Sequence, residues 1–354
     1  MSTADSLLPV VLAADNFPLH PYHPYPVRNP LTNEQYIPFH LSPADHALDL
    51  PPVGLLRPQI LAALLEEHAA SGSESPWTFF RADPHRHDSK IVCVAFSPAV
   101  RAKGREAMSK AIADVAAKWK AAGKFPEALD GWRNELYTIY ASPKSSALAK
   151  PTGAFSNTAF ACERAACALF GFATFGVHMT AYEGQGADMK IWVPRRSPTK
   201  ATWPSMLDNT VAGGITDGLN PIETMVKECD EEASLPESLV RSRLRNVGAA
   251  TYFYITSAGF LQPEIEYLYD LPLPARDSPD YVLPRPHDDE VESFSLWTVP
   301  DVIKALRAGE FKPNCGLILI DFLVRHGLVT PENEPHYLEL QWHMRRRIGV
   351  GVPA

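Results

Sequence analysis

The sequence predicts an α/β protein in which an α/β/α sandwich around a mixed sheet follows a smaller α/β domain. Three observations predict this fold class. Strand and helix patterns alternate through the second half of the chain, a separate set of such patterns precedes residue 145, and a Ser-, Lys-, Pro- and Gly-rich stretch over 142–153 lies between the two sets. The 354 residues, 45% of them hydrophobic, are enough for two cores.

The first predicted domain spans residues 1–145. Its first 50 residues are rich in Pro, His and Tyr, which predicts an extended, loop-rich arm. Apolar residues at three- and four-residue steps, or in short continuous runs, predict its regular elements. These are helices over 57–69 and 97–121 and strands over 89–96 and 136–140.

The second predicted domain spans residues 146–354 and forms the sandwich. An Ala- and Cys-rich stretch predicts a helix at its start, over 158–170. β-branched and aromatic runs predict several strands after it. The predicted strands are 176–182, 189–194, 244–256, 264–272 and 290–299, and the further helices are 222–233, 300–308 and 314–326.

A glycine loop leads into the helix predicted over 222–233. Gly213, Gly214 and Gly218 precede it, Asn220 is a good N-cap, and Pro221 suits the first helical turn. Glu228, Glu231 and Glu232 then lie within an arc of roughly 100° on one helix face.

These three like charges repel one another, and Mg²⁺ or Mn²⁺ would relieve the repulsion through hard oxygen ligands. An acidic helix face exposed to solvent is the alternative.

This loop and helix resemble the Nudix box, in which glycine precedes a helix that ends on a cluster of glutamates. In register, Gly213, Glu228, Glu231, Glu232 and Leu235 match the box. The resemblance implies that Glu228, Glu231 and Glu232 hold the metal ions together with the Gly213 carbonyl. It also implies that Glu228 and Glu231 are catalytic, with Glu228 as the favoured general base.

Three positions depart from the box. Leu219 stands where the first glutamate belongs, Lys227 replaces arginine, and Ser234 replaces glycine. Lys227 keeps a positive charge but loses the planar fork that binds a carboxylate bidentately, and we count it among the substrate-binding candidates. Ser234 lacks the preference of glycine for the left-handed conformation, although Pro236 still stops the helix.

Further segments are similar to one branch of the Nudix superfamily, the proteins associated with thiamine pyrophosphokinase in fungi and found as separate chains in plants. The segments are 177–233, 310–316, 321–327 and 330–335. The resemblance implies a Mg²⁺- or Mn²⁺-dependent diphosphatase that acts on thiamine diphosphate or on its oxo and oxy analogues. A nucleotide or dinucleotide hydrolase, of the 8-oxo-dGTP or ADP-ribose type, and a binding module without turnover are the alternatives.

Other site residues follow from charge and position. Glu290 and Glu292 would share one face of a strand, and we favour Glu290 as a further acid or general base, with an exposed strand start as the alternative. Arg195, Arg196 and Lys200 precede the glycine loop and are candidates for binding phosphate, with a solvated turn as the alternative.

Aromatic side chains at four positions are candidates for stacking on a heteroaromatic ring. For each of them, packing in a core is the preferred interpretation. The four are Trp192, Trp203, Tyr252 and Tyr254.

Composition excludes several classes of partner. The net charge of −8 gives no general attraction to nucleic acid or anionic membranes. No basic segment precedes the apolar stretch 7–14, no apolar run approaches the roughly 20 residues that span a bilayer, and the five cysteines have no paired spacing. We therefore predict a cytoplasmic protein with a small-molecule diphosphate as its partner. The oligomeric state is not predicted.

Overall fold

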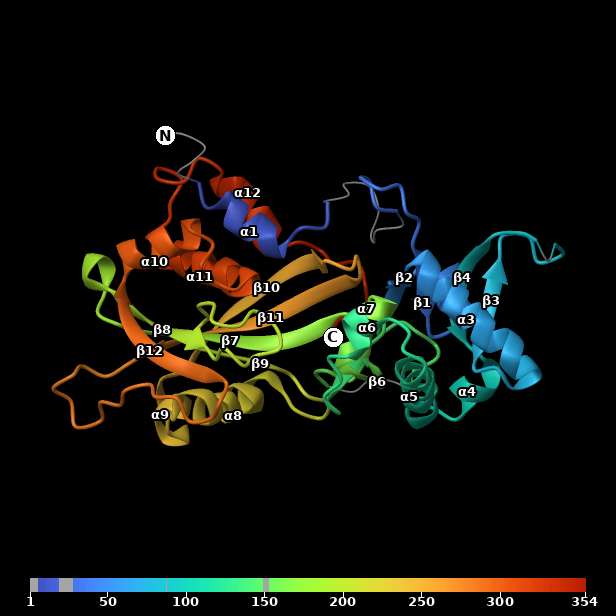
Figure 1. The fold of residues 1–354 in the computed structure, drawn as a ribbon, viewed down its shortest axis with the longest axis horizontal. Helices are drawn as coiled ribbons and strands as arrows, with labels where there is room; N and C mark the ends of the chain where they lie inside the picture. Colours follow the sequence, from blue (N-terminus) through green and yellow to red (C-terminus); the bar gives the residue numbers. More distant parts are fainter. Residues whose placement is uncertain (1–5, 19–27, 87, 149–152) are drawn as a thin grey trace.

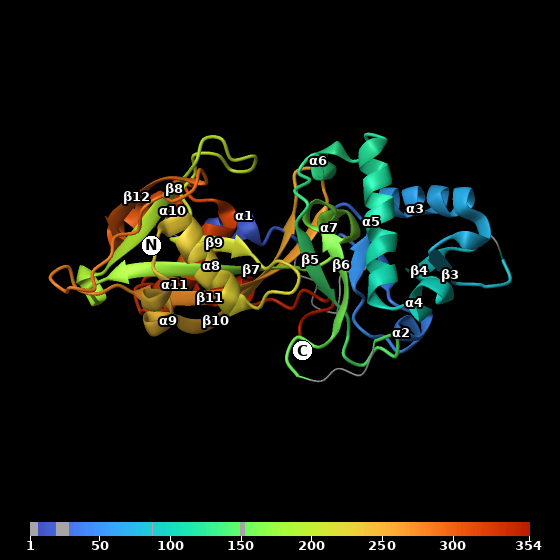
Figure 2. The same ribbon diagram turned by 90° about the horizontal axis from the view of Figure 1, so that it is seen from below.

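The computed structural model describes residues 6–18, 28–86, 88–148 and 153–354, so segments 1–5 and 19–27 of the predicted arm lie outside the described residues. The described part of the arm contains helix α1 (Leu8–Ala14), strand β1 (Ile37–His40) and helix α2 (Pro43–Ala47), so the prediction of an extended, loop-rich segment is wrong there. Two bodies lie side by side along the long axis of the molecule (Figures 1 and 2). The larger body holds a six-stranded sheet, and the smaller one holds a four-stranded sheet beside a two-stranded one. No helix among the described residues is both long and apolar enough to cross a membrane.

The six-stranded sheet has the order β10-β11-β7-β8-β12, with β9 paired to β7. β7 and β11 run parallel and the other pairs are antiparallel, which confirms the predicted mixed sheet. All five strands predicted for this domain are present, and β9 is a short addition. The bounds are β7 Thr174–Glu183, β8 Lys190–Arg196, β9 Val211–Gly214, β10 Arg245–Ile255, β11 Leu261–Pro272 and β12 Val291–Thr298.

Helices cover both faces of this sheet, as Figure 1 shows. Alternate residues of β7 explain the layering, because Val177 and Met179 pack in one core with Met225 of α8, while Tyr182 packs in the core of the opposite face. The two layers and the sheet form the predicted α/β/α sandwich. One layer has α8 (Pro221–Ala233) and α9 (Glu237–Arg243), and the other has α1 (Leu8–Ala14), α10 (Val299–Arg307), α11 (Pro313–Arg325) and α12 (Tyr337–Met344).

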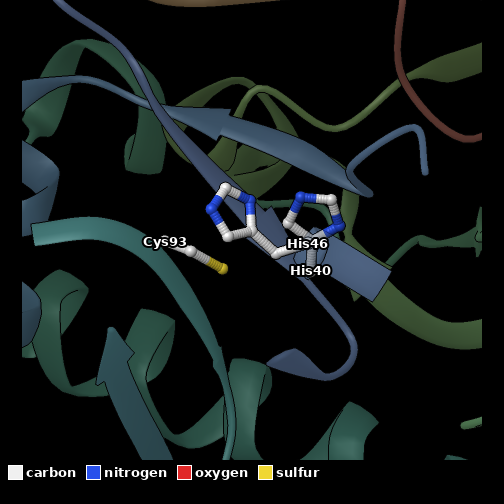
Figure 3. A group of neighbouring side chains, drawn as sticks. All are labelled: His40, His46 and Cys93. Carbon is white, nitrogen blue, oxygen red and sulfur yellow. The ribbon is translucent and has the colours of Figure 1, made fainter. Parts of the chain in front are cut away.

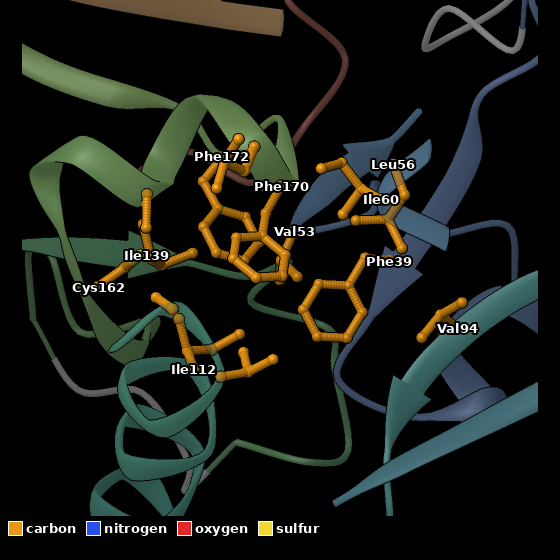
Figure 4. Close-up of a cluster of buried hydrophobic side chains, with 14 of the residues drawn as sticks. Phe39, Val53, Leu56, Ile60, Val94, Ile112, Ile139, Cys162, Phe170 and Phe172 are labelled. Atoms are coloured by element: carbon orange, nitrogen blue, oxygen red, sulfur yellow. The ribbon is translucent and has the colours of Figure 1, made fainter. Parts of the chain in front are cut away.

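The smaller body is built on a sheet of order β2-β1-β4-β3. Its core is rich in aromatic rings, and Phe39, Phe170 and Phe172 lie together at its centre (Figure 4). The bounds are β1 Ile37–His40, α2 Pro43–Ala47, β2 Gly54–Leu56, α3 Pro58–Ser71, β3 Trp77–Arg81, β4 Ile91–Phe96, α4 Pro98–Ala102, α5 Arg105–Ala121 and α6 Pro126–Leu129.

Two helix predictions differ from the structure. The helix predicted over 97–121 is divided into α4 and α5 at Gly104, whose φ of 76° ends the first segment. The helix predicted over 158–170 is wrong in its first half, which is strand β6 (Thr158–Glu163) before helix α7 (Arg164–Phe170). β6 pairs with β5 (Leu136–Tyr140), and this long-range ladder outweighs the local helix preference of an Ala-rich stretch.

Several segments pack across the predicted boundary at residue 145. β6 and α7 contribute Phe160 and Phe170 to the core of the smaller body. In the other direction, α1 packs against α11 in the larger body, where Val11 is fully buried. The backbone N–H of Gly351 donates to the carbonyl oxygen of Pro52, so the last residues also contact the smaller body. The division into 1–145 and 146–354 therefore stays a proposal.

Candidate metal and phosphate site

Helix α8 begins at the N-cap and proline that its sequence predicts, and it ends at the predicted position. The Asn220 side chain accepts a hydrogen bond of 3.0 Å from the backbone N–H of Glu223, and Pro221 is the first helical residue. Ser234 ends the helix in the left-handed conformation, with φ of 52°, although it is not glycine. The helix is thus fixed at both ends, and its acidic side chains have a defined position against the sheet.

Strand β9 lies directly against two of the predicted acids. A Cβ atom added at Gly213 would lie 2.4 Å from both Cγ and Cδ of Glu228, so only glycine leaves room for this carboxylate. The backbone N–H of Ala212 donates to Glu232 Oε2 at 3.1 Å. The structure therefore brings Gly213, Glu228 and Glu232 together at the edge of the sheet.

Glu231 lies at the rim of this group. Its carboxylate is half-exposed and lies 2.5 Å from Lys227 Nζ, which is also 3.4 Å from Glu228 Oε1. Lys227 therefore partly compensates both acids, as a single charge without the fork of arginine. By themselves the three acids do not form a compact ligand set, because their ligand atoms do not all lie within 4.8 Å of one another. Among the described residues only one group, His40, His46 and Cys93, meets this criterion.

The acids of the site carry more negative charge than nearby cations offset. Burial raises the pKa of Glu232 well above its usual value, and the charges of Asp208 and Glu228 raise it further. Burial also raises the pKa of Glu228, while Lys227 opposes the shift and Glu231 and Glu290 add to it. A cation between these oxygens would lower the electrostatic cost of their burial.

Glu266 of β11 is a site residue that sequence reasoning missed. Tyr252 donates its hydroxyl to Glu266 Oε1 at 2.9 Å, while the buried Oε2 has no hydrogen-bond partner and lies 3.6 Å from His178 Nε2. A Cβ added at Gly176 would lie 2.2 Å from this Oε2 and 3.1 Å from the Gly213 carbonyl oxygen. The free carboxylate oxygen therefore lies close to the proposed metal-binding carbonyl.

Asp208 and Lys312 are two further residues that sequence reasoning did not single out. Leu207 donates its backbone N–H to the Glu310 carbonyl and accepts one from Lys312, each at 2.9 Å, which holds these segments together. Asp208 is buried and accepts from Arg196 at 2.5 Å and from the Cys315 thiol at 2.6 Å.

Burial works to raise the pKa of Asp208, but Lys312 and Arg196 hold it below its usual value. The segments 207–214 and 310–316 both carry the resemblance noted in the sequence. That resemblance was the signal that these residues belong to one site.

The predicted phosphate-binding cations have different positions. Arg196 is fixed by Asp208 and by the carbonyl oxygens of Trp203 and Thr202, each 3.0 Å away, and its charge acts on Glu232. Arg195 donates to the Ser205 carbonyl at 2.7 Å and pairs with none of the site acids.

Lys200 Nζ lies 2.5 Å from Glu290 Oε2. Burial works to raise the pKa of Glu290, but Lys200 holds it below its usual value. Because the charge of Glu290 also acts on Glu228 and Glu232, the structure places this acid at the border of the same group.

The candidate stacking residues are divided between core and surface. Trp192 and Tyr252 are buried in the two cores of the sandwich, as preferred from the sequence. Trp203 is exposed, and Tyr254 is half-buried beside a core. Of the four, Trp203 therefore has the most accessible ring.

Two cavities lie beyond the acidic group. The larger, of about 690 Å³, lies between α9 and the loop that follows β11, and the smaller has about 260 Å³. Both are lined by Arg245 and Pro272, and none of the predicted site residues lines either of them.

Comparisons with known proteins match most of the larger body to a named family. Residues 173–315 match the family described as NUDIX domain. An uncharacterized protein of Saccharomyces cerevisiae is 41% identical over 230 residues, which cover 62% of each chain. Nudix hydrolase 20, chloroplastic, of Arabidopsis thaliana is 37% identical over 243 residues, which cover 68% of this chain and 59% of the relative. The chain thus spans about three fifths of the length of these curated relatives.

Solved structures are similar only at low level. An Ap4A hydrolase of C. elegans is 17% identical, with a TM-score of 0.30 over 43% of this chain and 98% of the other. Residues 173–315 are thus similar to the NUDIX domain family, and the relative of Arabidopsis thaliana is named as a Nudix hydrolase.

Proposed function

We propose that this chain is a hydrolase that cleaves a diphosphate link in a small molecule and uses Mg²⁺ or Mn²⁺. The single observation that carries the proposal is the contact between β9 and α8, in which Glu228 and Glu232 meet the backbone of Ala212 and Gly213. This contact lies inside the segment that matches the NUDIX domain family. Support also comes from the plant relatives, which are named as Nudix hydrolases.

The residues at this contact suit a hard divalent cation. Glu228, Glu232 and the Gly213 carbonyl would hold it, with Glu231 at the rim, and all of them offer oxygen ligands. The Oε2 of Glu266 accepts no hydrogen bond, although His178 Nε2 lies 3.6 Å away, and it is a further oxygen that could face a cation. When bound, the ion would neutralise charge on phosphate oxygens and lower the pKa of a water ligand.

Protein side chains would supply the remaining chemistry. A general base works best when its pKa is near the working pH, and burial raises the pKa of Glu228 while Lys200 holds that of Glu290 low. We therefore propose Glu228 as the base that takes the proton of the attacking water. Glu290 would instead position Lys200, which can turn to a phosphate oxygen when the substrate enters. Arg196 and Lys227 border the same acids and would bind the second phosphate.

Thiamine diphosphate and its oxo and oxy analogues are the substrate class that we propose. The resemblance of segments 310–316, 321–327 and 330–335 to the thiamine-associated branch supports it, and the first segment contributes Lys312 and Cys315 to the site. The products would be the monophosphate and inorganic phosphate.

Competition among substrates tests this class. We expect kcat/KM for oxo- or oxythiamine diphosphate to exceed that for 8-oxo-dGTP, ADP-ribose and common nucleoside triphosphates by at least about tenfold, roughly 1.4 kcal/mol of transition-state binding. A kcat/KM for a nucleotide that is higher by this margin would instead indicate a nucleotide hydrolase. Binding of thiamine diphosphate without phosphate release would make it a binding module.

We propose that the protein resides in a reducing compartment, the cytoplasm. All five cysteines are free and buried, which suits a cell compartment that keeps thiols reduced. The two plant relatives are named as chloroplastic. Tagged protein followed by microscopy and fractionation would separate these locations.

A further inference from the structure

A second polar cluster lies in the smaller body, away from α8 (Figures 1 and 2). His40 ends β1, His46 lies in α2, and Cys93 lies in β4. One ligand atom of each lies within 4.8 Å of the other two, and among the described residues no other group of three or more His, Cys, Asp and Glu meets this criterion. Figure 3 shows the three side chains gathered at one place.

The strand register explains why these side chains meet. β1 and β4 run parallel, with Phe39 opposite Val94 and His40 opposite Ala95. Phe39 and Val94 therefore point into the aromatic core, while His40 and Cys93 point to the other face of the sheet. Helix α2 packs on this face against both strands and brings His46 to them.

Two buried polar atoms lack hydrogen-bond partners, one on His40 of the cluster and one on Asp45, the residue before His46. His40 is 1% exposed and its Nε2 has no hydrogen-bond partner. Asp45, which lies beside His46 in α2, is 3% exposed and its Oδ1 also has none, although its Oδ2 accepts from the Ser42 N–H at 3.2 Å and from the Ser145 hydroxyl at 2.8 Å. A buried polar atom without a partner destabilises the folded state, so a ligand that uses the lone pair of His40 Nε2 would be stabilising.

We propose that His40, His46 and Cys93 bind a Zn²⁺ ion, separate from the metal ions of the diphosphate site. Imidazole nitrogen and cysteine sulfur are typical zinc ligands, whereas the acids near α8 offer only oxygen. In a tetrahedral zinc site the ligand atoms lie roughly 3.3 to 3.6 Å apart, so small side-chain movements would close the present group around an ion.

His46 is only half-buried, which leaves the fourth position open to water. As the sulfur–zinc bond forms, the thiol proton of Cys93 passes to solvent.

The bound ion would tie together three elements that are distant in sequence. β1, α2 and β4 are held by sheet pairing and packing, and the ion would add a crosslink at the end of β1. Asp45 contributes a negative charge beside the ion without joining its ligands, and the capping box that it forms with Ser42 fixes the turn of α2 that carries His46. The bound ion would therefore stabilise this end of the smaller body.

Cobalt substitution tests the site in the full-length chain. Metal-free protein titrated with Co²⁺ should develop a near-ultraviolet sulfur-to-cobalt charge-transfer band that saturates at one equivalent, and Zn²⁺ should abolish the band. Cobalt held by Glu228, Glu231 and Glu232 would have oxygen ligands and would give no such band. Cys315 is the cysteine whose thiol contacts Asp208 at that site, so a Cys315→Ser variant should keep the band as well. The Glu232→Gln variant should therefore keep the band unchanged, which separates this proposal from the diphosphatase.

Matched variants identify the ligands. Cys93→Ser should lose the band, while Cys162→Ser, which changes an equally buried cysteine of β6, should keep it. His46→Gln should weaken Co²⁺ binding at least tenfold, while His68→Gln, which changes another half-buried histidine, should not. A wild-type protein without the band, or a Cys93→Ser protein that retains it, would overturn the proposal. Should Cys93→Ser fail to fold, equal Co²⁺ affinity of His46→Gln and wild type would overturn it as well.

Discussion

Glu232 is the residue on which the diphosphatase site depends most directly. It is the acid that contacts the backbone of β9, and it lies among Asp208, Glu228 and Glu290 with no cation as a direct hydrogen-bond donor. Replacing it by glutamine removes charge with little change in shape. We expect Glu232→Gln to lower kcat/KM at least about 10²-fold, roughly 2.7 kcal/mol of barrier, while the protein remains folded.

An exposed acid on the same helix provides the control. Asp230 is exposed and lies on α8 two residues before Glu232, so Asp230→Asn should leave kcat/KM within about twofold of wild type. Glu231→Gln should lower activity less than Glu232→Gln, because Glu231 is half-exposed and paired with Lys227. Equal activity of wild type and Glu232→Gln at saturating Mn²⁺ would show that this acid holds no essential ion.

The pH dependence of stability gives an independent test of the same carboxylate. The pKa of Glu232 is raised above 4.5 in the folded protein, so the folded state binds this proton more tightly than the unfolded chain does. This contribution is complete below about pH 4.5 and is lost as the pH rises through the folded pKa, at about 1.4 kcal/mol for each pH unit at most.

Chemical unfolding with a chelator present should therefore show stability that decreases from pH 5 to pH 8. The Glu232→Gln protein should show a weaker decrease and should be more stable than wild type at pH 8. Identical slopes for the two proteins would contradict the raised pKa.

Sequence reasoning at this scale found the acids of one helix and missed their partners on other elements. Glu228 and Glu232 are close in sequence, and helical geometry alone relates them. Glu266 and Lys312 reach the site through strand order and through the contact of segments 207 and 310–312, which no local pattern encodes. The acids of α8 also differ in their partners, because Glu231 contacts Lys227 and not β9. This difference depends on where α8 packs.

Among the secondary-structure elements, the pairing of β7 with β9 shapes the site most. Gly176 of β7 faces Gly214 across the ladder, and its missing side chain leaves space for Glu266 Oε2 beside the Gly213 carbonyl. Gly176→Ala would place a methyl group 2.2 Å from that carboxylate oxygen. We expect this change to raise the Mn²⁺ concentration for half-maximal activity about 10- to 100-fold, because the oxygens near the ion would move.

Gly131→Ala is the matched control, because its added methyl group would meet only one carbonyl oxygen, at 3.3 Å, in the other body. The Mn²⁺ dependence of activity should be the same for Gly131→Ala and wild type. An unchanged dependence in Gly176→Ala would separate Glu266 from the metal site.

Element predictions succeeded where the signal was local. The Asn220 cap and Pro221 place the start of α8, and β-branched and aromatic runs place the strands of the larger sheet. The prediction failed for β6, because its ladder partner β5 lies about 20 residues earlier and the Ala-rich composition favours a helix. β9 was too short for a period of two to be recognised.

At the scale of the whole molecule, the first described residues stabilise the larger body. Ser6 and the backbone N–H of Leu7 bind the buried carboxylate of Glu334 at 2.6 and 2.8 Å, and α1 packs against α11. Leu7 is 2% exposed, so Leu7→Ala should lower the free energy of unfolding by about 2–5 kcal/mol. Thermal or chemical unfolding measures this loss.

Leu12 lies in α1, which begins directly after Leu7, but it is 37% exposed, and Leu12→Ala should cost less than about 1 kcal/mol. Equal stability of Leu7→Ala and wild type would show that α1 does not contribute to the folded core. By the same reasoning, a fragment over 150–354 would lack both α1 and β5 and should be less soluble than the full chain.

The central claim, that the contact of β9 with α8 holds a cation for diphosphate hydrolysis, is tested most directly by phosphate release. Thiamine diphosphate and its oxo and oxy analogues would be incubated with wild type, Glu232→Gln and Asp230→Asn, each with Mn²⁺ or with a chelator. The account predicts release of inorganic phosphate and the monophosphate by wild type and Asp230→Asn with Mn²⁺ alone, and at least about 10²-fold slower release by Glu232→Gln. Release that persists with the chelator, or is equal in all three proteins, would contradict it.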